Sequence, residues 1–389
     1  MSVTAAAGFR AAGVTAGLKA SGRPDLALVV SDGPEYTAAG VFTTNRVVAA
    51  PVVWTRQAIS DGVARAVVLN SGGANACTGA QGFLDSHATA EFVSEVLGAD
   101  EVGAGDVMVC STGLIGDLLN MPVLTAGITA AAAELTAAGG RDAAQAIMTT
   151  DTVPKEAVSA GEGFVVGGMA KGAGMLNPAL ATMLVVITTD ASLDAATAHE
   201  ALAAAVETTF NRLDSDGCMS TNDTVLLLAS GASGVSPSGA EFAAALTEVC
   251  GSLARQLIAD AEGASHDIAV IVRNASTESA AVAVARAVTS SNLFKAAIFG
   301  NDPNWGRVLA AVGTVPESVA PFDAAALDVT MNGVQVARGG GVGDSRELVD
   351  LSPREVTIEI DLHAGDATAT VWTNDLTHDY VHENSAYST

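Results

Sequence analysis

The chain has 389 residues, of which 49% are hydrophobic and 16% are charged. This composition supports a large packed interior and excludes a mostly disordered chain. Its 18 basic and 43 acidic residues give a net charge of -25. Because such a field repels phosphate backbones and anionic membranes, we expect neither nucleic acid nor a membrane as a partner.

The cysteines and the start of the chain point to a reducing compartment. The four cysteines are widely spaced and form no C-x-x-C pair, which indicates neither a zinc site nor a disulfide framework. The Ala-rich start lacks a compact apolar segment behind a basic one, and no run approaches about 18 consecutive apolar residues. We therefore expect a cytoplasmic protein.

Short β-rich runs alternate with longer Ala-rich stretches, which is typical of a layered α/β protein. The pattern predicts strands at residues 26–31, 66–70, 106–110, 183–188, 225–229 and 268–272. It predicts helices at 86–97, 123–138 and 239–261. Ser86 is the expected N-cap of the first helix, and Gly98 and Gly139 are expected stops. Ser238 and Glu241 form the capping box that announces the third helix.

The last third of the chain changes character and predicts a second domain. Strands are expected at 327–331, 356–362 and 367–373 in an antiparallel arrangement, joined by Gly-rich turns. The GGGVGD run at 339–344 is interpreted as a hairpin turn, because it lacks the spacing of a dinucleotide fingerprint. We place the division between a larger α/β domain, 1–264, and a smaller one, 265–389.

Two histidines near the C-terminus have the spacing of a helical metal site. His378 and His382 lie four residues apart, but their segment has β character and offers no obvious third ligand. We therefore interpret them as structural or surface residues and expect no metal.

The segment KGAGMLNPALATML, residues 171–184, is the most informative in the chain. Its glycines allow left-handed backbone and close approach, and Pro178 stiffens the chain before Ala181. The β-rich run that follows can hold Thr182 firmly. On its own, this pattern predicts only a tight loop entering a buried strand.

The segment resembles the processing site of the ornithine acetyltransferase (glutamate N-acetyltransferase) family of arginine biosynthesis, in which an Ala-Thr bond is cut autocatalytically. Further similar blocks, in the family's order, lie at 107–116 (VMVCSTGLIG), 146–155 (AIMTTDTVPK), 210–225, 300–308 and 375–389. The resemblance implies a layered αββα sandwich like that of N-terminal-nucleophile enzymes, with a smaller C-terminal α/β domain. It also implies self-cleavage into an alpha chain, 1–181, and a beta chain, 182–389.

The mechanism that this resemblance implies has a clear chemical basis. Cleavage between Ala181 and Thr182 would free an α-amino group, whose ordinary pKa of about 7.7–8.0 suits it to act as a base for the threonine hydroxyl. Thr182 would then take acetyl from N2-acetylornithine and pass it to glutamate. The Thr112 side chain and the Gly113 backbone N–H would form the oxyanion hole that both steps require.

The resemblance also assigns the binding of substrate. Lys171 would pair with a carboxylate, the Thr152 hydroxyl would add hydrogen bonds, and Glu262 would bind an ammonium group. The C-terminus would return to the site. The implied substrate-binding residues are Thr152, Lys171, Thr182, Glu262, Asn384 and Thr389.

No metal or organic cofactor is expected, and the two fragments should stay together in an α₂β₂ or larger assembly. Three alternatives remain open. The chain could be a bifunctional member that also uses acetyl-CoA as donor, an N-terminal-nucleophile amidase or aminopeptidase, or a non-catalytic binding protein on the same fold.

Several positions depart from the family's usual pattern. They do not include a proposed catalytic residue, and they concern the surroundings that tune substrate preference. Gly73 stands where Asn is usual, Cys218 and Met219 replace a more polar pair, His266 stands where Lys is usual, and Ala179 and Leu180 vary the loop before the cut.

Overall fold

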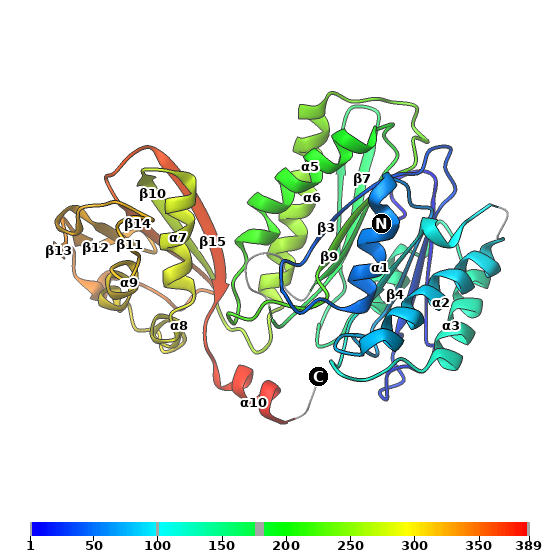
Figure 1. The fold of residues 1–389 in the computed structure, drawn as a ribbon. Helices are drawn as coiled ribbons and strands as arrows, with labels where there is room; N and C mark the ends of the chain where they lie inside the picture. The colour runs from blue at the N-terminus through cyan, green and yellow to red at the C-terminus, as the bar shows by residue number, and fades with distance from the viewer. Residues whose placement is uncertain (1, 99–100, 176–182, 387–389) are drawn as a thin grey trace.

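The computed structural model describes residues 2–98, 101–175 and 183–386. Two lobes of unequal size are joined by an extended segment and by the last helix (Figure 1). The larger lobe contains two sheets. The first has the order β1-β2-β4-β5 and is formed by β1 (Phe9–Val14), β2 (Leu26–Ser31), β4 (Ala66–Asn70) and β5 (Val107–Ser111).

The second sheet has the order β3-β9-β8-β7-β6. Its strands are β3 (Thr37–Phe42), β6 (Lys155–Ala160), β7 (Val165–Lys171), β8 (Leu184–Thr189) and β9 (Thr224–Ala229). The pairs β4–β5 and β8–β9 are parallel, and the other neighbouring strands are antiparallel. Side chains from the two sheets meet in one buried cluster, which includes Leu69 and Met108 from the first and Val186 and Leu228 from the second.

Helices cover the outer faces of both sheets. The first sheet is covered by α1 (Ala50–Ala58), α2 (Gly79–Leu97) and α3 (Met121–Ala133), and the second by α5 (Ala195–Thr208) and α6 (Gly239–Ala259). The short α4 (Gly140–Ala146) contributes to the cluster between the sheets. Single 3₁₀ turns are η1 (Ile59–Asp61), η2 (Ala104–Asp106) and η3 (Phe210–Arg212). The layers are helix, sheet, sheet and helix, so the predicted αββα sandwich is confirmed.

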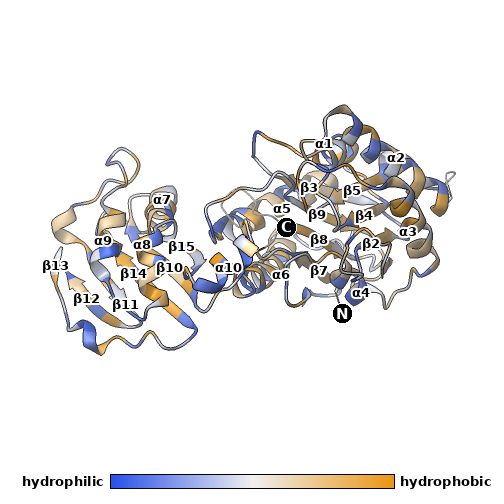
Figure 2. Cartoon of the chain, turned by 90° about the horizontal axis from the view of Figure 1, so that it is seen from below, coloured by the Kyte–Doolittle hydropathy of each residue, from blue (hydrophilic) through white to orange (hydrophobic). Residues whose placement is uncertain are grey.

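The smaller lobe is a six-stranded sheet with helices on one face. The strand order is β13-β12-β11-β14-β10-β15. The strands are β10 (Asp267–Ala275), β11 (Asp328–Met331), β12 (Val334–Arg338), β13 (Gly341–Val342), β14 (Glu355–Asp361) and β15 (Ala367–Asn374). The helices are α7 (Glu278–Thr289), α8 (Asn292–Phe299) and α9 (Trp305–Val312), with the turns η4 (Ala324–Ala326) and η5 (Arg346–Leu348). The strands of both lobes carry hydrophobic residues, which alternate with hydrophilic ones in the smaller lobe (Figure 2).

The expected antiparallel strands are present in this sheet, but β14 and β15 are not neighbours. The strand β10 lies between them, parallel to β14 and antiparallel to β15. Gly339 and Gly340, with φ of 54° and 67°, make the predicted hairpin turn between β12 and β13. The proposed domain division after residue 264 falls between α6 and β10, and the lobes meet where Asp214 N–H donates to the Trp372 carbonyl at 2.9 Å.

Helix ends show where local signals succeed and fail. The capping box of α6 is confirmed, since the Ser238 backbone N–H donates to Glu241 Oε2 at 3.0 Å and the Ser238 hydroxyl accepts from Glu241 N. The predicted N-cap at Ser86 is wrong. Its buried hydroxyl donates to the Gly82 carbonyl and accepts from the Asn75 amide, so it lies inside α2.

The predicted end of the second helix near Gly139 is also wrong. The helix α3 ends at Ala133, because Thr136 pairs its backbone with that of Ala11 at the edge of the first sheet. Gly139 is instead the N-cap of α4. A tertiary backbone contact has therefore replaced more than a turn of helix.

The segment 378–386, expected to have β character, is the helix α10 (His378–Ala386), so that expectation is wrong. It lies between the lobes in both views (Figures 1 and 2). The Thr377 hydroxyl donates to the Gly263 carbonyl at 2.7 Å and accepts from Tyr380 N at 3.0 Å. The His378 ring packs edge-on against Phe299 with centroids 5.4 Å apart.

His378 and His382 belong to no metal site that the structure describes. Within residues 2–98, 101–175 and 183–386, no group of three or more His, Cys, Asp or Glu side chains could hold a metal ion. None of the helices in these ranges is both long enough and apolar enough to cross a membrane.

Gly263 tests whether α10 is held by close backbone packing. Its φ is +62°, and a Cβ there would lie 2.3 Å from the Tyr380 nitrogen. We predict that Gly263→Ala displaces α10 and speeds hydrogen exchange of its backbone amides by about tenfold or more, a shift of about 1.4 kcal/mol.

Gly234 is the matched control, because its φ is +67° and no atom lies within 4 Å of the point that a Cβ would occupy there. Gly234→Ala shares the left-handed strain of about 1–2 kcal/mol but should leave exchange in α10 unchanged. Equal exchange in the two variants would contradict the proposed packing.

Candidate active site

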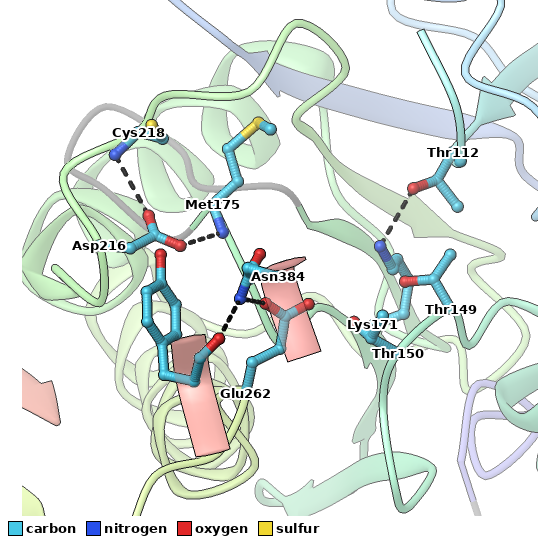
Figure 3. A pocket seen from close by; sticks show the side chains of 12 residues that line it. Thr112, Thr149, Thr150, Lys171, Met175, Asp216, Cys218, Glu262 and Asn384 are labelled. Carbon is cyan, nitrogen blue, oxygen red and sulfur yellow. Dashed lines mark hydrogen bonds between the residues drawn. The ribbon is translucent and has the colours of Figure 1, made fainter. Parts of the chain in front are cut away.

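A cavity of about 180 Å³ lies where the larger lobe meets α10, and several charged and hydroxyl side chains line it. One side carries Thr112, Gly113, Thr149, Thr150 and Lys171, and the other carries Asp216, Cys218, Glu262, Tyr380 and Asn384. Figure 3 shows the labelled side chains in these two groups, with Met175 between them. The sequence-predicted residues Thr112, Gly113, Lys171, Glu262 and Asn384 therefore share one cavity.

A hydrogen bond between the two sheets forms one wall of the cavity. Lys171 ends β7, and Thr112 follows the last residue of β5. The Lys171 Nζ donates to Thr112 Oγ1 at 3.0 Å, and the lysine is only 1% exposed (Figure 3). Because the threonine oxygen accepts this bond, its own O–H remains able to donate into the cavity.

Gly113 requires the absence of a side chain. Its φ is +129°, and a Cβ would lie 2.7 Å from the Gly73 nitrogen. The Gly73 N–H donates to the Thr112 carbonyl at 3.0 Å. Gly73, one of the departures from the family's pattern, thus supports the Thr112–Gly113 turn through its backbone.

Asp151 balances the buried positive charge behind this wall. Its Oδ1 accepts from Lys155 Nζ at 2.6 Å and from Gly172 N at 2.7 Å, and Oδ2 accepts from Thr149 N at 2.9 Å. Burial by itself would raise the pKa of Asp151, but the charges of Lys155 and Lys171 and the Gly172 hydrogen bond lower it to about 2. Burial lowers the pKa of Lys171, and Asp151 opposes that shift. The carboxylate therefore fixes both the Lys171 and Thr149 segments.

Thr152 lies outside the cavity. It is exposed, its hydroxyl donates to Asp260 Oδ1, and its backbone N–H donates to Asp260 Oδ2 at 3.0 Å. Thr149 and Thr150 line the cavity instead. The run Thr149-Thr150-Asp151-Thr152 identifies this segment as part of the site. The sequence does not indicate which of the three threonine hydroxyls faces the cavity.

The opposite side of the cavity is acidic. Asn384 Nδ2 donates to Glu262 Oε2 at 2.9 Å, and the Glu262 N–H donates to the Ala173 carbonyl at 2.9 Å. A Cβ on Gly174 would lie 2.6 Å from Glu262 Oε2, so this glycine makes room for the carboxylate. The C-terminal segment thus returns to the site through Asn384.

Asp216 and Tyr380 complete this side and were missed from the sequence. Asp216 accepts from Met175 N at 2.6 Å and from Cys218 N at 3.2 Å, and burial raises its pKa. Burial and the nearby Asp216 and Glu262 charges raise the pKa of Tyr380 to about 12. Tyr380 therefore stays protonated at neutral pH and can donate a hydrogen bond.

Ala181, Thr182 and Thr389 lie outside the described residues. The described chain resumes at Met183, whose N–H donates to Asp223 Oδ1 at 3.0 Å. Asp223 is fully buried, and burial raises its pKa well above the ordinary value.

Of the other departures, Cys218 lines the cavity, whereas Met219 and His266 do not. The Met219 carbonyl accepts from Asn45 Nδ2 at 2.8 Å, and His266 Nδ1 lies 2.8 Å from Asp375 Oδ2. Among the described residues, Met219 and His266 make these contacts away from the cavity lining.

The ArgJ family matches residues 10–389. The chain belongs to this family. It is 63% identical over 388 residues to the arginine biosynthesis bifunctional protein ArgJ of Streptomyces coelicolor and 60% identical over 389 residues to that of Thermobifida fusca, with 100% of each chain covered. A solved ornithine acetyltransferase from Mycobacterium tuberculosis, complexed with ornithine, is 55% identical over 47% of this chain and 96% of that chain, with a TM-score of 0.43. The resemblance seen in the sequence is confirmed at the level of the family.

The role of Asp151 in balancing Lys155 and Lys171 predicts a large, pH-dependent loss of stability in Asp151→Asn. The Asn variant would leave Lys171 without its nearby negative charge and Lys155 with Asp260 as its remaining carboxylate partner, and it should lower the free energy of unfolding by about 3–5 kcal/mol at neutral pH. Because the folded pKa is about 2 against an ordinary 3.8, the wild type holds this advantage above about pH 4 and loses it as the pH falls toward 2.

Urea unfolding at several pH values measures the difference. Asp344→Asn, an equal change of charge at an exposed position, should change stability by less than about 0.5 kcal/mol. A gap between the wild type and Asp151→Asn that stays constant from pH 5 to pH 2 would contradict the assignment.

Proposed function

We propose that this protein is an enzyme of arginine biosynthesis, acting in the cytoplasm, that transfers the acetyl group of N2-acetylornithine to glutamate. The observation that carries the proposal is the Lys171–Thr112 hydrogen bond beside the turn at Gly113. This bond places the Thr112 hydroxyl and the Gly113 backbone N–H at the cavity. Other residues that line the cavity precede residue 176 or follow residue 182 in the sequence. Family membership and the names of the relatives support the same activity.

The reaction begins with self-cleavage. The Thr182 hydroxyl attacks the Ala181 carbonyl, the C–N bond breaks, and water hydrolyses the resulting ester. The alpha chain then ends at Ala181, and the beta chain begins with the free amine of Thr182. This amine can accept the hydroxyl proton, which the amide nitrogen of the uncut chain could not do.

Acetyl transfer reuses this machinery in two steps. The Thr182 hydroxyl attacks the acetyl carbonyl of N2-acetylornithine, and ornithine leaves with a proton on its amine. The amine of glutamate then attacks the acetyl-threonine ester and restores the hydroxyl. The Thr112 O–H and Gly113 N–H stabilise the tetrahedral oxyanion in both steps, and loss of one such donor typically costs about 10²–10³ in rate. This chemistry requires no metal or organic cofactor.

The charges of the cavity match an amino acid that carries an α-carboxylate and a side-chain ammonium group. Lys171 can pair with an α-carboxylate, while Glu262 lies among the residues on the opposite side and can bind the ammonium group of the ornithine side chain. Thr149 and Thr150 can supply hydrogen bonds near Lys171. We propose that they take the role that the sequence analysis gave to Thr152, and that Asn384 orients Glu262.

The interleaving of strands explains how the fragments could stay together after cleavage. In the second sheet, β8 and β9 come from the beta chain and lie between β3 and β7 of the alpha chain. Their ladders, from Lys171↔Leu184 to Thr37↔Ala229, cross the proposed fragment boundary. Separating the fragments would expose both ladders and the buried clusters around them. Association into an α₂β₂ or larger assembly remains a proposal for light scattering to test.

Thr182→Ala and Thr182→Ser separate the two tasks of this side chain. Without a hydroxyl, the alanine variant should remain a single chain of 38.7 kDa and show no acetyl transfer. The serine variant keeps the oxygen but loses the methyl group that restricts χ1, so it should cleave and turn over more slowly. Intact mass and N-acetylglutamate formation are the measurements.

Uncleaved Thr182→Ala also provides its own control for folding, since its urea unfolding should remain cooperative. The mechanism would be refuted if the alanine variant were still cleaved after residue 181. It would also be refuted if that variant made N-acetylglutamate at the wild-type rate.

A hydrolase that releases acetate is the second candidate, and product analysis distinguishes it. A transferase should form N-acetylglutamate in a 1:1 ratio with ornithine, because glutamate's amine replaces water at the ester. We predict this ratio at saturating glutamate, measured by mass spectrometry. Ornithine release accompanied mainly by free acetate would favour an N-terminal-nucleophile amidase.

A further inference from the structure

A buried lysine of the smaller lobe adjoins the acidic side of the candidate active site. Lys295 belongs to α8, and it is only 5% exposed. It lines a pocket of about 180 Å³, the Lys295 pocket, to which Ser215, Asp216, Asp375 and Tyr380 also contribute. Asp216 and Tyr380 line the cavity of the candidate site as well. These two side chains therefore form the boundary between Lys295 and the cavity.

The segment that carries Asp216 belongs to the larger lobe, but side chains of the smaller lobe hold it. The segment lies between η3 and β9, and Lys295 Nζ donates to the Ser215 carbonyl. One residue earlier, Asp214 Oδ2 accepts from the Thr289 hydroxyl at the end of α7, at 2.6 Å. These contacts fix the backbone that leads into Asp216 from across the boundary between the lobes.

Two backbone N–H groups fix the Asp216 carboxyl at the cavity. Its Oδ2 accepts from Met175 N at 2.6 Å, and its Oδ1 accepts from Cys218 N at 3.2 Å (Figure 3). Each oxygen retains a lone pair that can accept from a ligand. Glu262 lines the same side of the cavity. A cation bound between the two carboxylates would offset their mutual repulsion.

The charge of Lys295 favours the ionised form of Asp216. Burial raises the pKa of Asp216, the Lys295 charge opposes that rise, and the Glu262 charge adds to it. Burial lowers the pKa of Lys295, and the charges of Asp214, Asp216 and Asp375 oppose that shift. The lysine and these carboxylates therefore stabilise one another's charged forms where little water is present.

The other titratable groups near Asp216 supply no positive charge. They are Glu262, which follows α6, Tyr380 of α10, and Cys218, two residues further along the chain. Burial and the charge of Asp216 raise the pKa of the Cys218 thiol and that of the Tyr380 hydroxyl. Neither group is therefore a source of charge at neutral pH. Removing the Lys295 ammonium group would leave Asp216 facing the repulsion of Glu262.

We propose that Lys295 is a positioning residue for the donor: it holds the 215–216 segment so that the Asp216 carboxylate, together with Glu262, binds the side-chain ammonium group of N2-acetylornithine. This inference rests on the proposed function and deepens it. An ammonium group has three N–H donors, so it can bind both carboxylates at once. The smaller lobe would then take part in recognising the donor, although Lys295 itself does not touch it.

A purely structural lysine is the alternative. In that case Lys295 would only balance the charges of Asp214 and Asp375, and its loss would affect every substrate alike. The two roles differ in their consequences for donors that have and lack the side-chain amine. N2-acetylnorvaline has the carbon chain of N2-acetylornithine without that amine, so it provides the comparison.

The experiment measures kcat/KM for N-acetylglutamate formation from each donor across the acid and neutral pH range. The proteins are the wild type, Asp216→Asn, Lys295→Met and the double variant. Arg346→Met is the matched control, because it removes the same charge from an exposed position on η5 of the smaller lobe. The ratio of the two kcat/KM values is the discrimination between the donors.

We expect Asp216→Asn to lower kcat/KM for N2-acetylornithine about tenfold or more, mainly through KM, because the ammonium group loses a charged hydrogen-bond partner. The value for N2-acetylnorvaline should stay within about threefold of the wild type. Arg346→Met should leave the discrimination unchanged. Equal losses on both donors in Asp216→Asn would overturn the binding task given to this carboxylate.

Lys295→Met should move the acid limb of the N2-acetylornithine profile to higher pH, by about half a unit or more. Asp216 attracts the ammonium group only when it is ionised, and the variant removes the charge that opposes the rise of its pKa. The loss should therefore be largest at low pH and shrink as the pH rises. The N2-acetylnorvaline profile, and both profiles of Arg346→Met, should keep the wild-type limb.

The double variant shows whether Lys295 acts through Asp216. If it does, Lys295→Met should cost no further discrimination once residue 216 is Asn. An unshifted acid limb in Lys295→Met, or a further loss of discrimination in the double variant, would overturn the inference and leave the proposed function standing. A wild type that makes no N-acetylglutamate from N2-acetylornithine would instead refute the proposed function.

Discussion

The buried ammonium group of Lys171 is the constraint on which the arrangement of the site depends. A charge removed from water costs several kcal/mol unless partners surround it, and this lysine is 1% exposed. Its direct partner is Thr112 at the end of the other sheet, and Asp151 supplies negative charge behind it. Asp151 in turn fixes the Gly172 and Thr149 backbones. One electrostatic requirement thus aligns three segments that are distant in sequence, and it aligns them at the end of the strand that leads into the proposed cleavage loop.

The stacked sheets turn this local requirement into a rigid frame. The strands that carry Lys171 and Thr112 belong to different sheets, so their relative position depends on the packed cluster between them. A well-packed interior holds the donors of the site at a fixed spacing before the reaction starts. No free energy is then needed to order them during the reaction. The smaller lobe contributes differently. Through α10 it returns Tyr380 and Asn384 to the cavity, and this helix is docked on the backbone of Gly263 rather than on a large apolar surface.

The distribution of charge gives two adjoining hollows different preferences. The cavity contains one lysine opposite two carboxylates, which suits a small amino acid that carries a carboxylate at one end and an ammonium group at the other. The groove beside it, which Lys19 and Arg23 line, contains two cations, which suits an anion. Gly113, Thr149 and Thr150 line both hollows, so the differently charged surfaces meet beside the proposed oxyanion hole.

The sequence by itself determined the elements whose signals are local. The apolar runs of β2 and β4 were predicted with their observed bounds, and the capping box set the start of α6, because these depend on side chains close together in the chain. Family motifs selected Thr112, Gly113, Lys171, Glu262 and Asn384, which the fold brings to one cavity. The tertiary structure alone decided that α3 stops at Ala133, that Ser86 lies inside a helix, and that 378–386 is helical. It also decided that Thr149 and Thr150, rather than Thr152, face the cavity. Thr152 turns away because Asp260, more than a hundred residues later, accepts its hydroxyl and the Lys155 ammonium group, and no local pattern encodes a partner at that distance.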